Sequence, residues 1–335
     1  MPRQDPPVVT TLRQYREALE ARELAVMQDM ARRWVEIERR LDGDIAALAY
    51  EMQRRIDAGE AVTQQIVWRA QRYQQIKARL QEEIRRYNAD AATPIITAAQ
   101  RDNAWMGVES ARDAIYAGYN MRNVPYFPVL SRDQVETMAG FLGNGSPLNT
   151  LLKRDYPEAL QGLSDALVNG MARGLGASAT AKAMADGMGM GLERAMLIAR
   201  TEMNRAYRMA SVQQYRESRV VSGFRRLVKK ATACMACLML DGQKFDTADE
   251  LDDHPRGKCV AIPILIDGPA AQWQTGPQWF NTLTADEQRA KMGPEKYQLW
   301  QDGVIQPSDL AGVHHSPVWG DSPRVRTVAE LTGGE

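Results

Sequence analysis

A long apolar stripe near the N-terminus constrains the fold of this chain more than any other feature. Between residues 34 and 56, apolar residues recur at steps of three and four, which places them on one face of an α-helix. The stripe consists of Trp34, Ile37, Leu41, Ile45, Leu48, Met52 and Ile56. The pattern predicts a helix from about residue 10 to 57, which would be on the order of 70 Å long at about 1.5 Å per residue.

A second stripe follows the sequence DAGEAVT, which interrupts the helical pattern. Its members are Ile66, Ala70, Tyr73, Ile76, Leu80, Ile84 and Tyr87. Two long helices joined by a short link usually fold back on each other as an antiparallel pair. The first part of the chain is therefore predicted to form a long helical hairpin with solvated charged faces.

The chain is longer than a typical domain, and its residue composition changes along the sequence. It has 335 residues, so several modules are expected. Pro, Gly and Asn break the helical pattern from NVPYFPVLSRDQ to GNGSPLN, which predicts a junction near residue 120. We predict an α+β, predominantly α-helical protein with a hairpin (1–120), a middle domain (121–267) that contains a small β knuckle at 220–266, and an aromatic-rich helical segment (268–335).

Neither the net charge nor the hydropathy of the whole chain indicates nucleic acid or a membrane as a partner. The chain has 42 basic and 42 acidic residues, so any attraction to nucleic acid must come from local patches. The N-terminus has no apolar core of signal-peptide length, and the longest apolar run, CVAIPILI, is far shorter than the roughly 20 residues that span a bilayer. We expect a soluble protein with no membrane partner.

Positive charge is concentrated on a helix that is predicted from Leu192 to about Glu217. Residues 191–234 contain ten basic and three acidic residues. At about 100° per residue, the apolar residues gather on one side and four arginines on the other, namely Arg194, Arg205, Arg208 and Arg216. Such a stripe could bind the phosphates of double-stranded DNA or an acidic partner protein, or it could be a solvated face.

Three glycines precede this helix, at positions 187, 189 and 191. A dinucleotide-binding fingerprint needs a strand before its glycines, whereas a helix is predicted here. The glycines are therefore predicted to form a flexible joint between two helices.

All three cysteines lie in one short stretch, as Cys234, Cys237 and Cys259, with His254 between the last two. Predicted strands flank the stretch, and the Asp-Gly dipeptide in LMLDGQKF predicts a tight hairpin. A C-x2-C turn lets two thiolates meet at one ion, and the later His and Cys complete a tetrahedral set that suits structural Zn. No position remains for water, so such a site stabilises the fold and does not catalyse.

Two other interpretations of the cysteines remain open. They can be free thiols without a ligand, or Cys234 and Cys237 can form a redox dithiol, although a redox pair expects a thioredoxin-like setting and leaves His254 and Cys259 without a role. A catalytic zinc site is disfavoured, because neither the H-x-E with P-C-x-x-C of deaminases nor the H-E-x-x-H of zincins is present.

Three sequence segments together resemble a known family. In order and spacing, ERAMLIARTEMNRAYRMAS, ATACMACLMLDGQKF and HPRGKCVAIPI resemble the Mu F-like phage head morphogenesis proteins, also called minor head proteins. The resemblance covers roughly residues 160 to 267, and the segment WFNTLTADEQRAKMGPEKYQLWQDGVIQPSDL is similar to the C-terminal part of that family. The family pattern usually has a cysteine two residues before the last one, where this chain has Gly257.

The resemblance implies a non-enzymatic virion component that acts in capsid assembly. The implied partners are the portal protein and the major capsid or scaffold protein, with double-stranded DNA as a further contact during packaging or ejection. The implied location is the capsid interior or portal vertex, and the host cytoplasm during assembly.

The principal alternative is a zinc-supported nuclease of the histidine-asparagine-histidine type, or a DNA-binding zinc-knuckle protein. Asp253 and His254 resemble the first catalytic position of such a nuclease. However, the next asparagine is Asn281, and the next histidines, His314 and His315, are predicted to lie in a surface loop. A general coiled-coil adaptor would account for the hairpin and not for the knuckle. The tryptophans of the C-terminal segment predict a compact tail packed on the knuckle.

Overall fold

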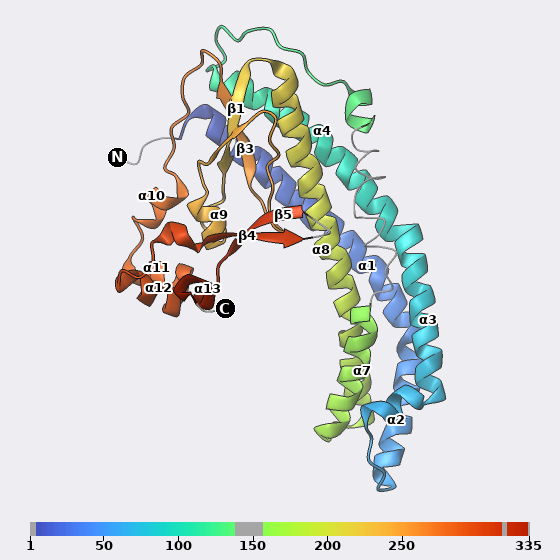
Figure 1. The fold of residues 1–335 in the computed structure, drawn as a ribbon. Helices are drawn as coiled ribbons and strands as arrows, with labels where there is room; N and C mark the ends of the chain where they lie inside the picture. The colour runs from blue at the N-terminus through green and yellow to red at the C-terminus, as the bar shows by residue number, and fades with distance from the viewer. Residues whose placement is uncertain (1–4, 138–156, 317–319, 334–335) are drawn as a thin grey trace. The chain divides into compact units, whose positions relative to one another are not determined.

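The computed structural model describes residues 5–137, 157–316 and 320–333, and it shows a mostly helical α+β protein, as predicted (Figure 1). Its first helical elements are α1 (Pro7–Asp57), α2 (Gln64–Arg69), α3 (Gln71–Tyr87), the π-helical turn η1 (Asn88–Ala92), α4 (Thr93–Gly118), α7 (Pro157–Ala172) and α8 (Ala177–Ser218). Then follow β1 (Val221–Leu227), α9 (Met235–Met239), β2 (Lys244–Asp246), β3 (Val260–Leu265), α10 (Gly276–Phe280), α11 (Ala285–Met292), α12 (Pro294–Gln301), the 3-10 helix η2 (Pro307–Leu310), β4 (Ala311–Ser316), β5 (Gly320–Val325) and α13 (Val328–Thr332).

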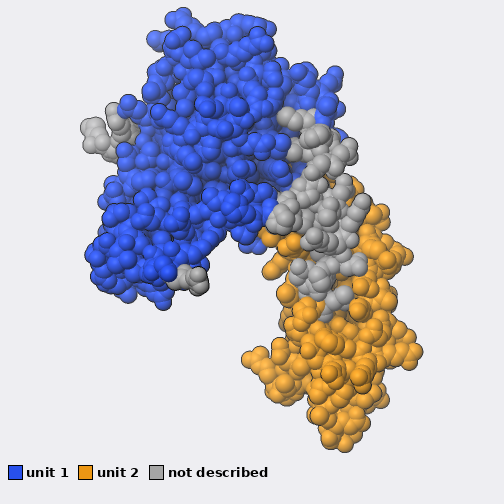
Figure 2. Space-filling model, viewed as in Figure 1, with its two compact units in different colours: residues 1–21, 100–145, 201–335 blue, residues 22–99, 146–200 orange. Residues whose placement is uncertain are grey.

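The chain divides into two compact units, each built from separate stretches of sequence (Figure 2). Unit 1 consists of Met1–Ala21, Gln100–Gly145 and Thr201–Glu335, and unit 2 of Arg22–Ala99 and Ser146–Arg200. Helices α1, α4 and α8 each contribute residues to both units. The units are interleaved along the sequence, so neither coincides with one of the three predicted regions, and that division stays a prediction.

The predicted helical hairpin is present in unit 2, where α1 and α3 pack side by side in opposite directions. Trp34 of α1 meets Tyr87 of α3 edge to face, with 5.2 Å between the ring centroids. Further along, Arg40 forms an ion pair with Glu83 at 2.6 Å. As the residue number rises along α1, the partner's number falls along α3, which is the register of an antiparallel pair. The members of the first stripe between Trp34 and Met52 are buried, so the stripe is the apolar face that holds the hairpin together.

The second stripe differs from its prediction because it is divided between two helices. Ala70 has the extended angles φ −63° and ψ 126°, which end α2 and begin α3. Thr63 starts α2 by accepting a hydrogen bond from the N–H of Ile66 with its side chain. The residues after the break, from Tyr73 to Tyr87, keep the helical spacing and form the face that packs on α1.

The predicted joint at the three glycines is wrong, because α8 runs through them without a break. The glycines allow close packing in unit 2. A Cβ built at Gly187 would lie 2.4 Å from the carbonyl oxygen of Gly162 on α7, and one built at Gly191 would lie 2.9 Å from the ring of Trp34. The helices approach at these points because glycine has no side chain, whereas Gly189 has nothing within 4 Å of its Cβ position.

Unit 1 contains a three-stranded antiparallel sheet in the order β2-β1-β3. The N-terminal turns of α1 pack on it through Val9 and Leu12, which share a buried cluster with Leu227 of β1 and Ile262 of β3. Another cluster joins the sheet to α8, where Tyr215 donates a hydrogen bond to the carbonyl of Ala261. The predicted hairpin at Asp-Gly is wrong, because this turn follows α9 and joins a helix, not a strand, to β2; Gly242 takes φ +89° there.

The C-terminal segment packs on the knuckle, as predicted. Phe280, Met292, Ile305 and Leu310 share one buried cluster with Met235 and Leu238 of α9 and with Cys237 and Cys259. A capping box of Thr284 and Glu287 starts α11. The sequence GNGSPLN and Trp319 lie outside the described residues.

We expect two Gly→Ala substitutions in α8 to change the free energy of unfolding in opposite directions. Alanine favours a helix over glycine by about 1 kcal/mol, so Gly189→Ala, which adds a methyl group in open space, should stabilise the protein by about 0.5–1 kcal/mol. Gly187→Ala should destabilise it by about 1–3 kcal/mol, because its Cβ meets backbone of α7. Urea denaturation measures both, and stabilisation by both variants would contradict the packing.

Candidate metal centre

The four predicted ligands come together in unit 1, although they belong to different elements. Cys234 is the N-cap of α9, where its Sγ accepts a hydrogen bond from the N–H of Cys237 at 3.4 Å. The C-x2-C motif is thus the first turn of α9. His254 lies in the loop before β3, and Cys259 immediately precedes that strand. All four side chains line one cavity of about 190 Å³, together with Glu20 and Lys258.

The sulfur, nitrogen and oxygen atoms form two overlapping sets of possible metal ligands. Cys234, Cys237 and His254 form the first set, and Cys237, Asp253 and Cys259 form the second. Within each set, the ligand atoms lie within 4.8 Å of one another. The Sγ of Cys234 is 3.5 Å from Nε2 of His254. Thiolates with one imidazole are the donors that zinc prefers, so the first set fits a structural zinc ion. Cys259 is grouped with Cys237 and Asp253 and not with Cys234 and His254.

Asp253 is the central residue of the cluster, and sequence reasoning missed this role. Its side chain is fully buried, and its carboxylate accepts hydrogen bonds from the backbone N–H groups of His254 and Cys259, both at 3.0 Å. The thiol of Cys237 also donates to it, at 3.6 Å. The carboxylate therefore fixes the backbone beside two predicted ligands and contacts a third.

Two buried arginines balance the charge of Asp253. Arg208 of α8 and Arg226 of β1 each place a guanidinium nitrogen 3.9 Å from its carboxylate oxygens. Burial alone would raise the pKa of Asp253, but the positive charges of Arg208, His254 and Arg226 outweigh burial and lower that pKa. Asp253 is therefore an ionised, paired carboxylate inside the protein.

The cysteines differ in protonation. A hydrogen bond with Cys237, reinforced by one with His254, outweighs burial and lowers the pKa of Cys234 to about 4. The hydrogen bond with Cys234 is also the largest cause that raises the pKa of His254, to about 9. The pair is therefore a thiolate beside an imidazolium. Because metal ligation needs a thiolate and a neutral imidazole, a metal ion would take the place of that proton.

Gly257 occupies the position where the Mu F-like pattern usually has a cysteine, and the structure shows what fills the space of that side chain. A Cβ built on Gly257 would lie 2.1 Å from the carboxyl carbon of Asp253. Asp253 cannot move aside cheaply, because two backbone N–H groups and two arginines hold it. In this chain a carboxylate therefore stands where a thiol would otherwise enter the cluster.

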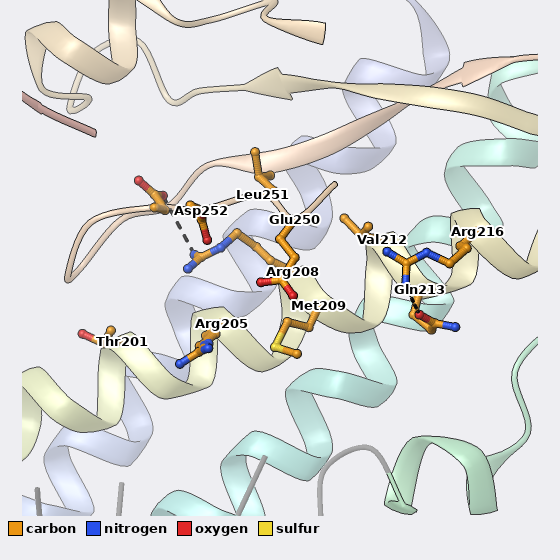
Figure 3. A pocket seen from close by; sticks show the side chains of 11 residues that line it. Thr201, Arg205, Arg208, Met209, Val212, Gln213, Arg216, Glu250, Leu251 and Asp252 are labelled. Carbon is orange, nitrogen blue, oxygen red and sulfur yellow. Dashed lines mark hydrogen bonds and ion pairs between the residues drawn. The ribbon is translucent and has the colours of Figure 1, made fainter. Parts of the chain in front are cut away.

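The four arginines of the predicted stripe do not share one environment. Arg208 is only 6% exposed and is committed to Asp253. Arg216 is exposed, yet it donates hydrogen bonds to the carbonyls of Thr247 and Ala248. Arg205 is half-buried and lines, with these two, a cavity of about 80 Å³ between α8 and residues 250–253 (Figure 3). Arg194 is half-buried in unit 2. Contact of the stripe with nucleic acid or an acidic partner stays a prediction.

The histidines that a nuclease would need lie elsewhere. His314 and His315 are exposed, as expected, but they lie on β4 and not in a loop. His315 Nδ1 is 2.6 Å from Oδ1 of Asp321 on the paired strand β5. Within the described ranges, His254 is the only histidine in a cluster that could hold a metal ion.

The comparison with protein families confirms the resemblance seen in the sequence. Residues 161–261 match the family model described as phage Mu protein F like protein. The matched segment begins within α7 and ends within β3, and it includes Cys234, Cys237, His254 and Cys259. Searches of curated proteins and of solved structures gave no match. No helix in the described part of the chain has the length and apolar character needed to cross a membrane.

We expect Gly257→Ala to destabilise the protein by about 1–3 kcal/mol, because its methyl group overlaps the held carboxylate of Asp253. In an Asp253→Ala background the same substitution should have little effect. A double-mutant cycle in urea measures this coupling. Equal effects of Gly257→Ala in both backgrounds would contradict the contact.

Proposed function

We propose that this protein acts in phage head morphogenesis as a non-enzymatic minor head protein. The observation that carries the proposal is the match of residues 161–261 to the Mu F-like family. The matched segment includes all four predicted ligands, and Asp253 links three of them by hydrogen bonds.

The arrangement of Asp253 and His254 supports a structural role for the cluster. A catalytic carboxylate or imidazole must reach a substrate atom within about 2.6–3.2 Å. The carboxylate of Asp253 is fully buried and already paired, and His254 Nδ1 lies 2.9 Å from the carbonyl of Pro255. Both groups serve the internal network, which disfavours the nuclease alternative.

We further propose that the partners are the portal protein and the major capsid or scaffold protein, at the portal vertex. DNA contact during packaging or ejection is a second element of the proposal. It is carried by Arg205 and Arg216 in unit 1 and by Arg194 in unit 2, since Arg208 is taken up by the cluster. Positive charge at each of these arginines would hold phosphates without sequence preference.

The head role can be tested in the phage or prophage that encodes this chain. A stop codon in its gene should abolish infectious particles, and mass spectrometry should detect the chain in purified wild-type heads. Supply of the wild-type chain in trans should restore infectivity. The Gly189→Ala variant, whose added methyl group contacts nothing, should restore it equally. Purified infectious heads without this chain would refute the proposal.

We also propose that Cys234, Cys237, His254 and Cys259 hold one structural Zn ion. Elemental analysis of protein purified under reducing conditions without chelator should find about one zinc per chain. Because binding to a structural site contributes directly to folding, Cys234→Ser and His254→Ala should each lower the zinc content and the melting temperature.

His314→Ala is the matched control, because His314 is an exposed histidine outside the cluster. It should leave zinc content and melting temperature unchanged. Reduced wild-type protein that binds no zinc would refute the metal proposal and leave the role in head morphogenesis untouched.

A further inference from the structure

A groove in unit 1, separate from the cysteine cluster, gathers positive charge and indole rings. Its volume is about 750 Å³, within the range of about 300–1,000 Å³ that is typical of small-molecule sites. Its lining comes from three distant stretches of the chain, at residues 5–13, 225–230 and 271–279. The charged lining residues are Asp5, Arg13, Arg225 and Lys230, so positive charge is in excess.

The strand β1 directs two consecutive arginines to opposite sides. Arg226 faces the cluster, where it pairs with Asp253. Arg225 faces the groove, and its guanidinium lies over the ring of Trp273 at 5.7 Å from the centroid. Alternation of side chains along a strand produces this separation. Arg225 is thus free of the network that occupies its neighbour.

The donors of Arg225 are poorly satisfied by the protein. Its Nε–H is buried without a hydrogen-bond partner among the described residues. Its Nη1 reaches the carbonyl of Ala271 only at 3.5 Å, the outer limit for a hydrogen bond. A guanidinium carries five N–H donors in a fork that matches a carboxylate or phosphate. This arrangement is incomplete without an anionic acceptor.

An anion in the groove would also pair with Lys230. Within the described ranges its ammonium group forms no ion pair, and the nearby carboxylate of Asp241 already accepts hydrogen bonds from the N–H groups of Val228 and Gly276. Burial lowers the pKa of Lys230, an effect that Asp241 partly offsets and Arg13 reinforces. An anion in the groove would relieve this unfavourable environment. Arg13 differs, because it is paired with Asp5.

The rest of the lining fits a planar group beside that anion. Trp279 is half-buried at the groove, and Gln272 and Gln274 are exposed there. An indole ring stacks on a nucleobase whatever its sequence, and amide groups pair with base edges. An acidic peptide would supply the charge and not the planar partner.

We infer that this groove binds a nucleotide, with its phosphate at Arg225 and Lys230 and its base toward Trp279. The nucleotide can be free or part of single-stranded DNA, because both present the same chemistry. The inference does not depend on the proposed role in head morphogenesis, since the isolated protein is sufficient to test it. It also differs from the arginines of α8, none of which lines this groove.

Fluorescence anisotropy of the full chain with two probes tests the inference, one being mant-ADP and the other a fluorescein-labelled dT12 oligonucleotide. At least one probe should bind with Kd below about 1 mM. Lys230→Gln and Arg225→Gln should each weaken binding about 10-fold or more, as expected for loss of a charged hydrogen bond to phosphate. Lys230 is the safer position for the fold, because its ammonium forms no ion pair in the described structure.

Arg289→Gln is the matched control, because it removes one positive charge from an exposed site on α11 outside the groove. It should change Kd less than twofold, and the melting temperatures of all variants should match the wild type. For dT12, each lost phosphate contact should reduce the slope of log affinity against log salt by about 0.7. Binding of mant-ADP alone would identify a free nucleotide, binding of dT12 alone would identify the strand, and mutual competition of the two probes would show that both occupy the same groove.

Three results would overturn the inference. The first is the absence of binding by either probe up to about 10 mM. The second is binding that Lys230→Gln leaves unchanged. The third is displacement of the bound probe by an oligoglutamate peptide at equal concentration of charge, because charge alone would then account for binding.

Discussion

The packing around the cysteine cluster of unit 1 depends on the buried carboxylate of Asp253. It joins α8 through Arg208, β1 through Arg226, α9 through Cys237 and the start of β3 through the backbone of Cys259. Removing one partner of a buried ion pair leaves an uncompensated charge and typically destabilises a protein by about 3–5 kcal/mol. Asp253 joins all of these elements. This one side chain therefore sets the position of the loop that carries His254.

The same network explains why neighbouring positive charges have different roles. Arg208 and Arg226 are paired with Asp253 in the interior, whereas Arg216 stays exposed while it donates hydrogen bonds to the carbonyls of Thr247 and Ala248. Arg225 and Lys230 face a groove in which the described residues leave the Nε–H of Arg225 without an acceptor and form no ion pair with Lys230. Net positive charge in a sequence window therefore overstates the charge that a partner can meet, and the position of each carboxylate decides which cations remain for binding.

The sequence predicts the long-range order of the helices well and the local chemistry of the site only in part. Helical spacing identifies α1 and the antiparallel hairpin, because an apolar stripe has only one way to be buried. It misses the break at Ala70, whose residue type does not indicate an extended conformation. It also misinterprets Gly187 and Gly191, because glycine is equally compatible with a flexible joint and with a close helix contact.

The candidate metal centre shows the same limit. Cys234, Cys237, His254 and Cys259 were recognisable because thiols and imidazole in this spacing have few other uses. Asp253 was recognisable as a polar neighbour of His254 and not as a buried counter-ion, since its partners Arg208 and Arg226 are 45 and 27 residues away in the sequence. The nucleotide groove has no sequence signature, because its walls come from three separate stretches that meet only in the fold.

Asp253 also bears on how a metal ion would contribute to stability. Its two backbone hydrogen bonds hold His254 and Cys259, and the N-cap hydrogen bond holds Cys234 against Cys237. Two pairs of ligands are therefore positioned by the protein itself, so the ion has little chain entropy left to overcome on binding. What the ion adds is a link between the two pairs, one at the start of α9 and the other at the entry to β3. A surface that spans α9 and β3 would keep its shape only while the metal ion or the carboxylate of Asp253 connects these two elements.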